Sequence, residues 1–374
     1  MSAKAHEIKE PPGHKPIKGG PWKVAVLANI KEHDKQPPPG APPDYMADYD
    51  YIETIQGIQA AIETDGHKTV FIQADGNLPY ALQDYKPDIC FNIAEGLEGD
   101  GREAHAPALL EMLRIPYTAS RVLTNAIALD KTLTKRIWNE RGLPIASYQE
   151  MISADEPLDE NLHYPLFIKP PREGTGMGVD PKAVAHNEAE LRERVDYVIC
   201  MYKQPALVEA FLPGREFTVG QMGRPDARKF SRHPEWYDPD GYHRFPILEL
   251  DSRPSVTPGI YGHAAKAQSV GTNGAPLYLC PAKIEPGLEA WLRETAMRAH
   301  HAIYTIDISR VDFRMDSNDQ PCLLEINPLP GLTPGYSDIC IMSAAEGISY
   351  EDLILEILYL AAGRWGLLEH RQND

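Results

Sequence analysis

The sequence predicts a multidomain protein of mixed α/β and α+β class that begins with a doubly wound parallel sheet. At 374 residues the chain is longer than a single hydrophobic core usually accommodates. Predicted strands and helices alternate as β-α-β-α-β over residues 22–96, the order typical of a parallel sheet with helices on both faces. A strand-rich segment follows later and ends in an amphipathic hairpin at residues 309–331.

The N-terminal elements follow from local periodicity and turn residues. "WKVAVLANI" alternates β-branched residues and predicts the first strand, and the Pro-rich segment 31–50 predicts a long surface loop. A helix over 51–66, a strand over 67–74, and a short helix with a third strand within 77–96 come next. Ligands of such sheets bind beyond the carboxyl ends of the strands. We therefore expect a site near the Pro-rich loop and "AEGLEGDGREAH", residues 94–105.

The middle and C-terminal parts read as two further domains. Residues 121–144 predict one helix ended by Gly142 and Pro144. Strands over 163–171 and 205–212 enclose a glycine-rich turn and a helix over 188–202. The remainder is strand-rich as far as residue 328 and closes with a helix over 349–366. The predicted divisions are a disordered lead (1–21), an N-terminal α/β domain (22–120), a small central domain (121–206) and a C-terminal domain (207–374).

Charge and composition exclude several classes of protein. The net charge is −17 and no basic stripe is visible, which argues against a nucleic-acid partner. No apolar run approaches the roughly 18–20 residues of a membrane span, and the first twenty residues lack the apolar core of a signal peptide. Five scattered cysteines without a CxxC pair indicate neither a disulfide framework nor a zinc site. We expect a cytoplasmic protein that binds neither nucleic acid nor membrane.

The segment "SRVDFRMDSNDQPCLLEINPLPG" predicts a hairpin with one apolar and one polar face, turning at Asn318 and Asp319. In this register Asp312 faces Glu325, Arg310 faces Asn327, Val311 faces Ile326, and Phe313 faces Leu324. Directly opposed carboxylates destabilise a sheet, and a divalent cation between them would remove that cost. An all-oxygen set of two carboxylates and one amide suits Mg²⁺. The alternative is a solvated face whose carboxylates point into water.

Other segments contain groups suited to binding phosphate. "FIKPPREGTGMGV" brings Lys169 to a glycine-rich loop, whose backbone N–H groups could approach phosphate oxygens; an ordinary hairpin turn explains the glycines equally well. Lys131 in "ALDKTLTK" reads, by itself, as an exposed helix lysine. Glu209 and Glu216 in "LVEAFLPGREFTVG" could bind ribose hydroxyls beside a strand that contacts adenine, or could simply be exposed glutamates.

In order and spacing these motifs resemble those of ATP-grasp carboxylate–amine ligases, and most of all the D-alanine–D-alanine ligases, over about residues 88–362. The resemblance implies an ATP-grasp fold and a set of roles. ATP would be held by Lys131, Lys169, Lys266, the flap Glu173, Gly174, Thr175, Gly176, Met177 and Gly178, the adenine-framing Glu209, Ala210, Phe211 and Leu212, and Glu216 near the ribose. Asp312, Glu325 and Asn327 would bind Mg²⁺ or Mn²⁺, Arg310 would be the transition-state cation, and the Gly331 N–H would hold the oxyanion.

The resemblance also implies a reaction in two steps. ATP phosphorylates a carboxylate, and an amine then displaces the phosphate to form an amide, in this chain an amide between two amino acids. The charge that develops on the transferring phosphoryl and carbonyl oxygens suits cations and aimed N–H donors. A homodimer is expected by analogy with the family.

Two departures from the family pattern concern the substrates. The GGxSxE signature is absent after the first strand, where the chain reads "LANIKEHDKQPPPG". Glu95, Arg102 and Glu103 are candidates for the missing contacts, although the last two could instead cap a helix. Ser337 matches a serine that in the family binds the acceptor's carboxylate, but Asp338 follows it, and that carboxylate would disfavour an acceptor with a carboxylate of its own.

The preferred function is therefore ATP- and Mg²⁺-dependent amide formation between a carboxylate and an amine. A true D-alanine–D-alanine ligase is the first alternative. An ATP-grasp kinase that stops after phosphoryl transfer and a nucleotide-binding regulator without turnover are further alternatives, and Arg310 argues against the regulator because binding alone would not need it.

Overall fold

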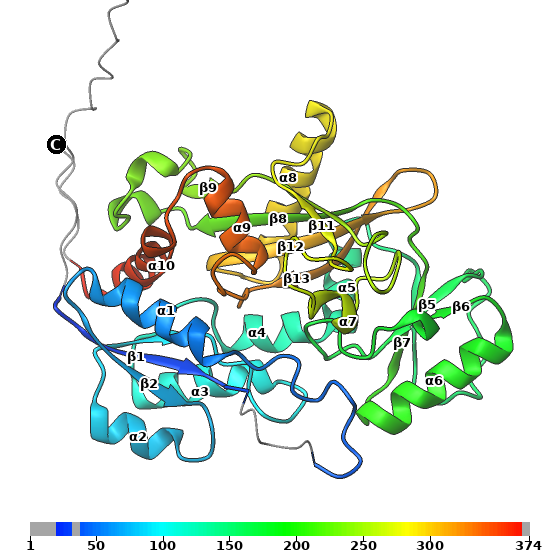
Figure 1. Ribbon diagram of the computed structural model, residues 1–374, viewed down its shortest axis with the longest axis horizontal. Helices are drawn as coiled ribbons and strands as arrows, with labels where there is room; N and C mark the ends of the chain where they lie inside the picture. Colours follow the sequence, from blue (N-terminus) through cyan, green and yellow to red (C-terminus); the bar gives the residue numbers. More distant parts are fainter. Residues whose placement is uncertain (1–19, 32–37, 369–374) are drawn as a thin grey trace, which may run out of the picture.

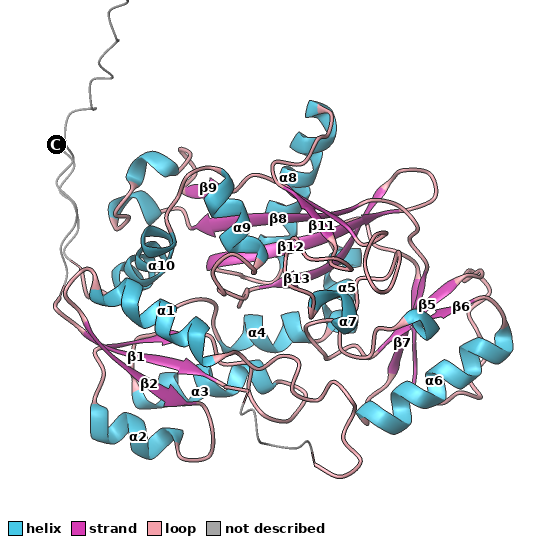
Figure 2. Ribbon diagram, viewed as in Figure 1, coloured by secondary structure: helices cyan, strands magenta, loops and turns pink. Residues whose placement is uncertain are grey.

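The computed structural model describes residues 20–31 and 38–368, within which the strands form three sheets. The parallel sheet lies beside the largest sheet, and the four-stranded sheet lies at the far end of the molecule (Figure 1). Mixed helices and strands throughout agree with the predicted fold class (Figure 2). The predicted disordered lead up to residue 19, and residues 32–37 of the Pro-rich loop, lie outside the described residues.

The N-terminal sheet is parallel and has helices on both faces, as predicted. Its strand order is β2-β1-β3. The strands are β1 (Lys23–Ala28), β2 (Lys68–Gln73) and β3 (Ile89–Asn92), and the helices are α1 (Ile52–Glu63), α2 (Leu78–Tyr85), the short η1 (Arg102–Ala104) and α3 (His105–Leu113). Along β1, Val24 and Val26 share a core with α1, whereas Ala25 and Leu27 share another with α2 and α3. This alternation follows from the two-residue period of a strand.

The four-stranded sheet is antiparallel, in the order β4-β7-β5-β6. It comprises β4 (Tyr148–Met151), β5 (Leu166–Lys169), β6 (Val184–Ala185) and β7 (Ala206–Ala210), with η2 (Pro181–Ala183) before β6 and α6 (Glu188–Tyr202) packed on the sheet. Leu191, Val195 and Val198 of α6 pack against Ile168 and Val208 of the sheet. This sheet therefore has a hydrophobic core of its own.

The largest sheet is antiparallel, in the order β11-β10-β8-β12-β13 with β9 beside β8. Its strands are β8 (Glu216–Gly223), β9 (Tyr242–Arg244), β10 (Leu248–Asp251), β11 (Leu277–Leu279), β12 (Asp307–Met315) and β13 (Pro321–Asn327). Helices α4 (Val122–Leu129), α5 (Lys131–Glu140) and α8 (Pro286–Ala302) pack on one face, and α9 (Asp338–Ala345) and α10 (Tyr350–Arg364) pack on the other; η3 (Ala227–Lys229), η4 (Pro234–Trp236) and α7 (His263–Lys266) lie in connecting segments.

Helix α10 joins the N-terminal domain to this sheet. Its residues 353–363 are buried, and they belong to a single core with α1, β1 and Ile308 of β12. The C-terminal helix was predicted from its apolar pattern, but its position between the two domains was not. The parallel sheet and the six-stranded sheet consequently share one hydrophobic core.

One predicted helix is in fact two. The single helix expected over 121–144 is interrupted at Asp130, whose backbone is extended (ψ 97°) and whose side chain accepts a hydrogen bond from Leu133 N at 3.0 Å. An aspartate at this position caps a new helix, so Lys131 becomes the first residue of α5. The third strand also ends earlier than predicted, at Asn92 rather than Gly96.

The hairpin register is confirmed near the polar residues and wrong beyond them. Asp312 pairs with Glu325 and Arg310 with Asn327 as predicted, but Phe313 pairs with Leu323 instead of Leu324. A bulge between Asp312 and Phe313 causes the shift, since it places two residues of one strand opposite one of the other. Leu324 lines a cavity together with Asp312, so the predicted polar face is not wholly polar.

No helix in residues 20–31 and 38–368 has the length and apolar character needed to cross a membrane.

His300 of α8 should make the fold sensitive to acid. Its ring is fully buried and its Nδ1 lies 2.8 Å from Ser309 Oγ. Burial lowers the pKa of His300 to about 3, so the unfolded chain takes up a proton at higher pH than the folded chain does. We expect the free energy of unfolding to fall as the pH drops from about 6.5 towards 3, by up to about 1.4 kcal/mol per pH unit from this group.

Urea unfolding at pH 7, 5.5 and 4.5 measures this dependence. His300→Gln should flatten it. The matched substitution His163→Gln, at an exposed histidine, should not. An equally steep dependence in wild type and His300→Gln would contradict the assignment.

Candidate active site

Two neighbouring cavities meet at the polar face of the β12–β13 hairpin. The larger, of about 560 Å³, lies between the N-terminal domain and the C-terminal sheet. The smaller, of about 100 Å³, lies between the four-stranded and six-stranded sheets. Arg310, Glu325 and Lys131 line both cavities. Groups in each cavity can therefore act on the same reacting centre.

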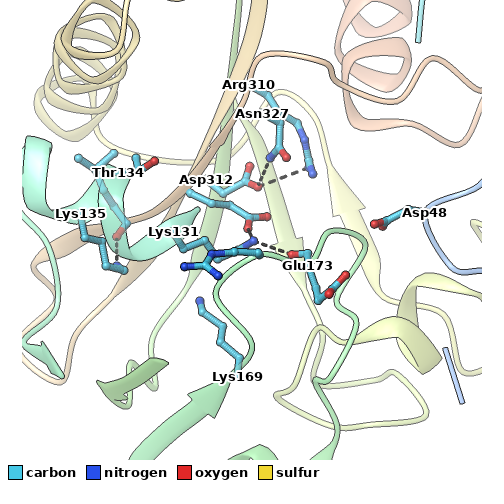
Figure 3. Close-up of polar contacts among 12 residues, drawn as sticks. Asp48, Lys131, Thr134, Lys135, Lys169, Glu173, Arg310, Asp312 and Asn327 are labelled. Atoms are coloured by element: carbon cyan, nitrogen blue, oxygen red, sulfur yellow. Dashed lines mark hydrogen bonds and ion pairs between the residues drawn. The ribbon is translucent and has the colours of Figure 1, made fainter. Parts of the chain in front are cut away.

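The predicted metal ligands gather where the cavities meet. Asp312 is buried and its Oδ1 accepts a hydrogen bond from Thr218 Oγ1 at 2.9 Å. Asn327 Nδ2 lies 3.4 Å from Asp312 Oδ2. Glu325 lies opposite Asp312 in the register. The carboxylate of Asp312 is therefore not on a solvated face, and Figure 3 shows Asp312, Asn327 and Arg310 grouped on the hairpin.

The two carboxylates have opposite electrostatic environments. Burial raises the pKa of Asp312 to about 7, with Arg310 opposing the rise and Glu325 adding to it. Burial would also raise the pKa of Glu325, but Lys131, Lys266 and Lys169 outweigh it and hold that pKa well below its usual range. Lys131 Nζ is 3.1 Å from Glu325 Oε2. Asp312 is thus the carboxylate that would gain most from a further cation.

The donor set fits a hard divalent cation. Asp312, Glu325 and Asn327 offer only oxygen among the atoms that could bind a metal, which suits Mg²⁺ or Mn²⁺ rather than a softer ion. Groups of three or more His, Cys, Asp or Glu side chains that could hold a metal do not occur in the described chain. A cation bound here would accordingly depend on the amide of Asn327 or on ligands from outside the protein.

Arg310 is held by two carboxylates. Its Nη1 forms a close ion pair with Asp338 Oδ2 and lies 3.6 Å from Asp312 Oδ2. The guanidinium is largely buried, and both carboxylates raise its pKa against the effect of burial. Arg310 therefore stays charged at the junction of the cavities, and Asp338 faces the site.

A second charged network lies in the smaller cavity. Glu209 is buried and bridges two lysines, with Lys135 Nζ at 2.7 Å from Oε1 and Lys169 Nζ at 2.8 Å from Oε2. Burial would raise the pKa of Glu209, but Lys135 and Lys169 lower it to about 2. Figure 3 shows Lys131, Lys135 and Lys169 in one region beneath the hairpin. Lys131 is buried rather than an exposed helix lysine.

The glycine-rich loop is folded against the C-terminal part of the Pro-rich segment. Gly178 N donates to Asp44 Oδ2 at 2.7 Å. Arg102 donates from Nη2 to Asp48 Oδ2 and to Glu173 Oε2, both at 2.9 Å. Lys131 Nζ donates to the Glu173 carbonyl at 2.6 Å. The described part of the Pro-rich loop therefore holds the glycine loop over the junction of the cavities.

The residues predicted to frame adenine line the smaller cavity. Phe167, Phe211 and Leu212 provide apolar surface, and the Phe167 and Phe211 rings lie with centroids 6.5 Å apart. Glu216 at the start of β8 pairs with Arg314, whose Nη1 is 3.4 Å from Oε2. An apolar slot with charged groups at its edge can accept a flat, polar-edged ring.

Acidic side chains gather in the larger cavity. Asp48, Asp50, Glu95 and Glu103 all line it. Burial raises the pKa values of Asp50 and Glu103 to about 7, and burial with nearby carboxylates raises that of Glu95. Gly331 also lines this cavity, and a Cβ added to it would lie 2.9 Å from Ser337 Oγ.

The structure brings most of the predicted site residues together. Those lining one or both cavities are Lys131, Lys169, Glu173, Gly174, Thr175, Gly176, Met177, Glu209, Ala210, Phe211, Leu212, Glu216, Lys266, Arg310, Asp312, Glu325, Asn327, Gly331, Glu95, Glu103 and Ser337. Arg102 and Gly178 are not among the lining residues. Arg102 neither caps a helix nor lines a cavity; it ties Asp48 to Glu173.

Three important residues were missed from the sequence. Lys135 follows Lys131 by one helical turn, and that spacing could have identified it. Asp44 and Asp48 lie in a loop without periodicity, so no local signal indicated their contacts. Their partners are distant in sequence and depend on how the domains pack.

Comparisons with known proteins agree with this arrangement. A model of the family described as "D-ala D-ala ligase C-terminus" matches residues 137–359. The uncharacterized protein y4sG of Sinorhizobium fredii is 31% identical over 350 residues, covering 91% of this chain and 95% of that one. The D-alanine–D-alanine ligase of Bordetella avium is 31% identical over 262 residues, covering 69% of this chain and 74% of that protein.

Solved structures show the same fold at low identity. The D-alanine–D-alanine ligase of Bacillus anthracis complexed with ATP superposes with a TM-score of 0.67 at 17% identity, covering 92% of this chain and 99% of that one. Another structure of that ligase gives a TM-score of 0.69 at 18% identity, covering 92% and 98%. The fold, with its two antiparallel sheets around a lysine-lined cavity, is of the ATP-grasp class. The chain belongs to the D-alanine–D-alanine ligase family.

Proposed function

We propose that this protein is an ATP-dependent carboxylate–amine ligase that joins two amino-acid-like substrates through an amide bond and forms ADP. The observation that carries the proposal is the position of Arg310, Lys131 and Lys266, which line both cavities. Cations shared by a nucleotide cavity and a substrate cavity can stabilise charge during transfer of a phosphoryl group between them.

The smaller cavity would bind ATP. Glu209, Ala210, Phe211 and Leu212 would frame adenine and Glu216 would lie near the ribose, while Lys131, Lys169 and Lys266 would neutralise phosphate oxygens. At about 100 Å³ this cavity is smaller than typical ligand sites, which occupy roughly 300–1,000 Å³. ATP entry would therefore require the glycine loop, Glu173 to Gly178, to move away.

Asp312, Glu325 and Asn327 would hold Mg²⁺ or Mn²⁺, which supplies positive charge to phosphate oxygens when bound. The chain's own groups would act around it. Arg310 would stabilise the transferring phosphoryl group, and the Gly331 N–H would donate to the carbonyl oxygen as it becomes negative. Glu95 and Glu103 would contact the ammonium group of the carboxylate-bearing substrate.

The reaction balances in two steps. A carboxylate oxygen of the first substrate attacks the γ-phosphorus of ATP, and the bond from that phosphorus to the β–γ bridging oxygen breaks. The products of this step are an acyl phosphate and ADP. The amine nitrogen then attacks the acyl carbon, giving a tetrahedral oxyanion. Collapse breaks the bond to phosphate, and the nitrogen loses its proton, so the products are amide, phosphate and ADP.

A true D-alanine–D-alanine ligase is a second candidate, because relatives such as the Bordetella avium protein bear that name. We also propose a cytoplasmic location and a homodimer. Size-exclusion chromatography with light scattering would test the dimer, and a mass of a single chain would contradict it.

The first experiment is ADP release with Mg²⁺-ATP across pools of L- and D-amino acids and small amines, with mass spectrometry of positive pools. A condensed product establishes the ligase and identifies its substrates, and D-alanyl-D-alanine as the best product favours the second candidate. ADP with a phosphorylated compound and no amide would contradict ligation and indicate a kinase.

Gly176→Ala should weaken ATP binding. Gly176 has φ +70°, and an added Cβ would lie 2.8 Å from His263 N. A left-handed backbone with a steric clash costs about 1–3 kcal/mol, which corresponds to a roughly 5- to 100-fold higher KM for ATP if the loop must close over phosphate. ATP titrations of ADP release measure the effect.

Gly142→Ala is the matched control, because Gly142 also has a positive φ but no neighbour near an added Cβ. It should reduce stability without changing the KM for ATP. Unchanged ATP affinity in Gly176→Ala would contradict the role of the loop.

A further inference from the structure

Asp338 places a fixed negative charge in the larger cavity. It is the first residue of α9, it is buried, and it lines the cavity wall. Its Oδ2 forms the close ion pair with Arg310 Nη1. The side chain is therefore held in position by the same guanidinium that lies at the junction of the two cavities.

This charge lies close to the backbone that we propose holds the oxyanion. Ser337, the residue before Asp338, lies beside Gly331, because a Cβ added to Gly331 would be 2.9 Å from Ser337 Oγ. Ser337 Oγ also accepts a hydrogen bond from Thr333 N at 2.9 Å. Gly331, whose N–H is proposed to hold the oxyanion, and the carboxylate of Asp338 therefore belong to one short segment, residues 331–338.

Asp338 already lies at the two groups that would otherwise attract a substrate carboxylate. The N-terminus of a helix and an arginine side chain both favour an anion. Here α9 begins with Asp338, and Arg310 is already bound to it. A substrate carboxylate would have to displace this internal anion and would be repelled by it.

The larger cavity has other cations besides Arg310. Lys131 is paired with Glu325. Lys266 also lines the nucleotide cavity, and its Nζ lies 4.7 Å from the centroid of the Tyr261 ring. Lys31 Nζ lies 5.6 Å from the Tyr51 ring. Lys31 and Lys266 could therefore still bind a carboxylate.

We propose that Asp338 makes the enzyme select an acceptor amine that carries no carboxylate beside its amino group. The acceptor class is then an amino alcohol, an amino acid amide or a simple amine rather than a free amino acid. This inference rests on the proposed ligase function and specifies the class of its amine substrate. Asp338 would achieve this selection by repelling acceptors that carry a carboxylate.

The test separates phosphoryl transfer from acceptor choice. Hydroxylamine is first supplied with Mg²⁺-ATP and pooled L- and D-amino acids as donors, because it traps an acyl phosphate as a hydroxamate whichever acceptor is natural. With a positive donor, kcat/KM is then measured for alaninol and for alanine, each in both enantiomers. The two acceptors differ by a neutral hydroxymethyl group in place of the carboxylate, and their amines have similar basicity.

We expect wild-type protein to prefer alaninol over alanine by at least about tenfold, equivalent to ~1.4 kcal/mol. Asp338→Asn should lower that ratio by about tenfold, and Asp338→Glu should retain it. Glu346→Gln, a carboxylate-to-amide change beyond the other end of α9 at a residue that contacts His243, should leave the ratio unchanged. The ratio of kcat/KM for alaninol to kcat/KM for alanine is taken within each variant, so a change in overall activity cancels.

Hydroxamate formation with an equal or greater preference for alanine in wild type would overturn the inference but keep the ligase function, and would direct attention to Lys31 or Lys266. An unchanged ratio in Asp338→Asn would also overturn it. Absence of both hydroxamate and ADP in every donor pool would overturn the ligase function and the inference together. If Asp338→Asn does not fold, the wild-type ratio alone decides the question.

Discussion

Asp312→Asn is expected to lower kcat for ADP release by about 10²- to 10³-fold, or ~2.7–4 kcal/mol in activation free energy, the range found when one preorganised electrostatic contact is lost. Asp312 is the buried carboxylate opposite Glu325, with its Oδ1 held by Thr218. Asparagine keeps the size and a hydrogen-bond acceptor but removes the charge that would bind a divalent cation. Initial rates over a Mg²⁺ titration measure both the loss of kcat and the weakened metal dependence.

The same substitution should not destabilise the fold. Without metal, burial raises the pKa of Asp312 to about 7, so its ionised form is disfavoured in the folded protein at neutral pH. A neutral side chain relieves that cost, and Tm in Mg²⁺-free buffer should stay the same or rise. Asp319→Asn is the matched control, because Asp319 lies in the exposed turn of the same hairpin with φ +57°, which asparagine tolerates. Equal kcat in wild type and Asp312→Asn would rule out the metal role.

Glu209→Gln is expected to reduce the free energy of unfolding by about 3–5 kcal/mol, the usual cost of breaking a buried ion pair from one side. Glu209 is the carboxylate shared by Lys135 and Lys169. With glutamine in its place, two buried ammonium groups would face each other without compensation. Urea denaturation at pH 7 measures the loss. In wild type this contribution should be present at neutral pH and should diminish as the pH falls below about 4.5 towards 2, because the pKa of Glu209 is lowered to about 2.

A double-mutant cycle tests the cause. Lys135→Met removes one of the two lysines and, combined with Glu209→Gln, should recover part of the lost stability. Glu249→Gln is the surface comparison, since its partner Arg215 is 44% exposed, and it should cost less than about 1 kcal/mol. Simple addition of the Glu209 and Lys135 effects would show that the two side chains do not interact energetically.

The polar residues of the hairpin could be predicted because a strand alternates sides with each residue. That period placed Asp312 opposite Glu325 and Arg310 opposite Asn327, as the structure confirms. The bulge at Leu324 of β13 could not be predicted, since strand alternation assumes a register without an extra residue. The parallel sheet could also be predicted from a local pattern, because its strands and helices alternate over short stretches of sequence.

Local sequence patterns do not predict contacts between segments that are distant in the chain. Arg102 was considered as a substrate contact or a helix cap, yet it holds Asp48 and Glu173 together across three segments of the chain. Lys131, by itself, reads as an exposed helix residue, and only the family resemblance assigns it to ATP; the structure buries it. In both cases the outcome depended on which surfaces the domains bury against each other.

Helix α10 has a mechanical consequence. Because it unites the N-terminal domain and the six-stranded sheet in a single core, we expect these two parts to move as one block, which keeps the separation of the cavity walls that they contribute. The four-stranded sheet has an independent core, so we expect it to move as a lid once the contacts of its glycine loop with Asp44 and Arg102 are broken. Opening for nucleotide exchange would then leave the parallel sheet and the six-stranded sheet in the same relative position.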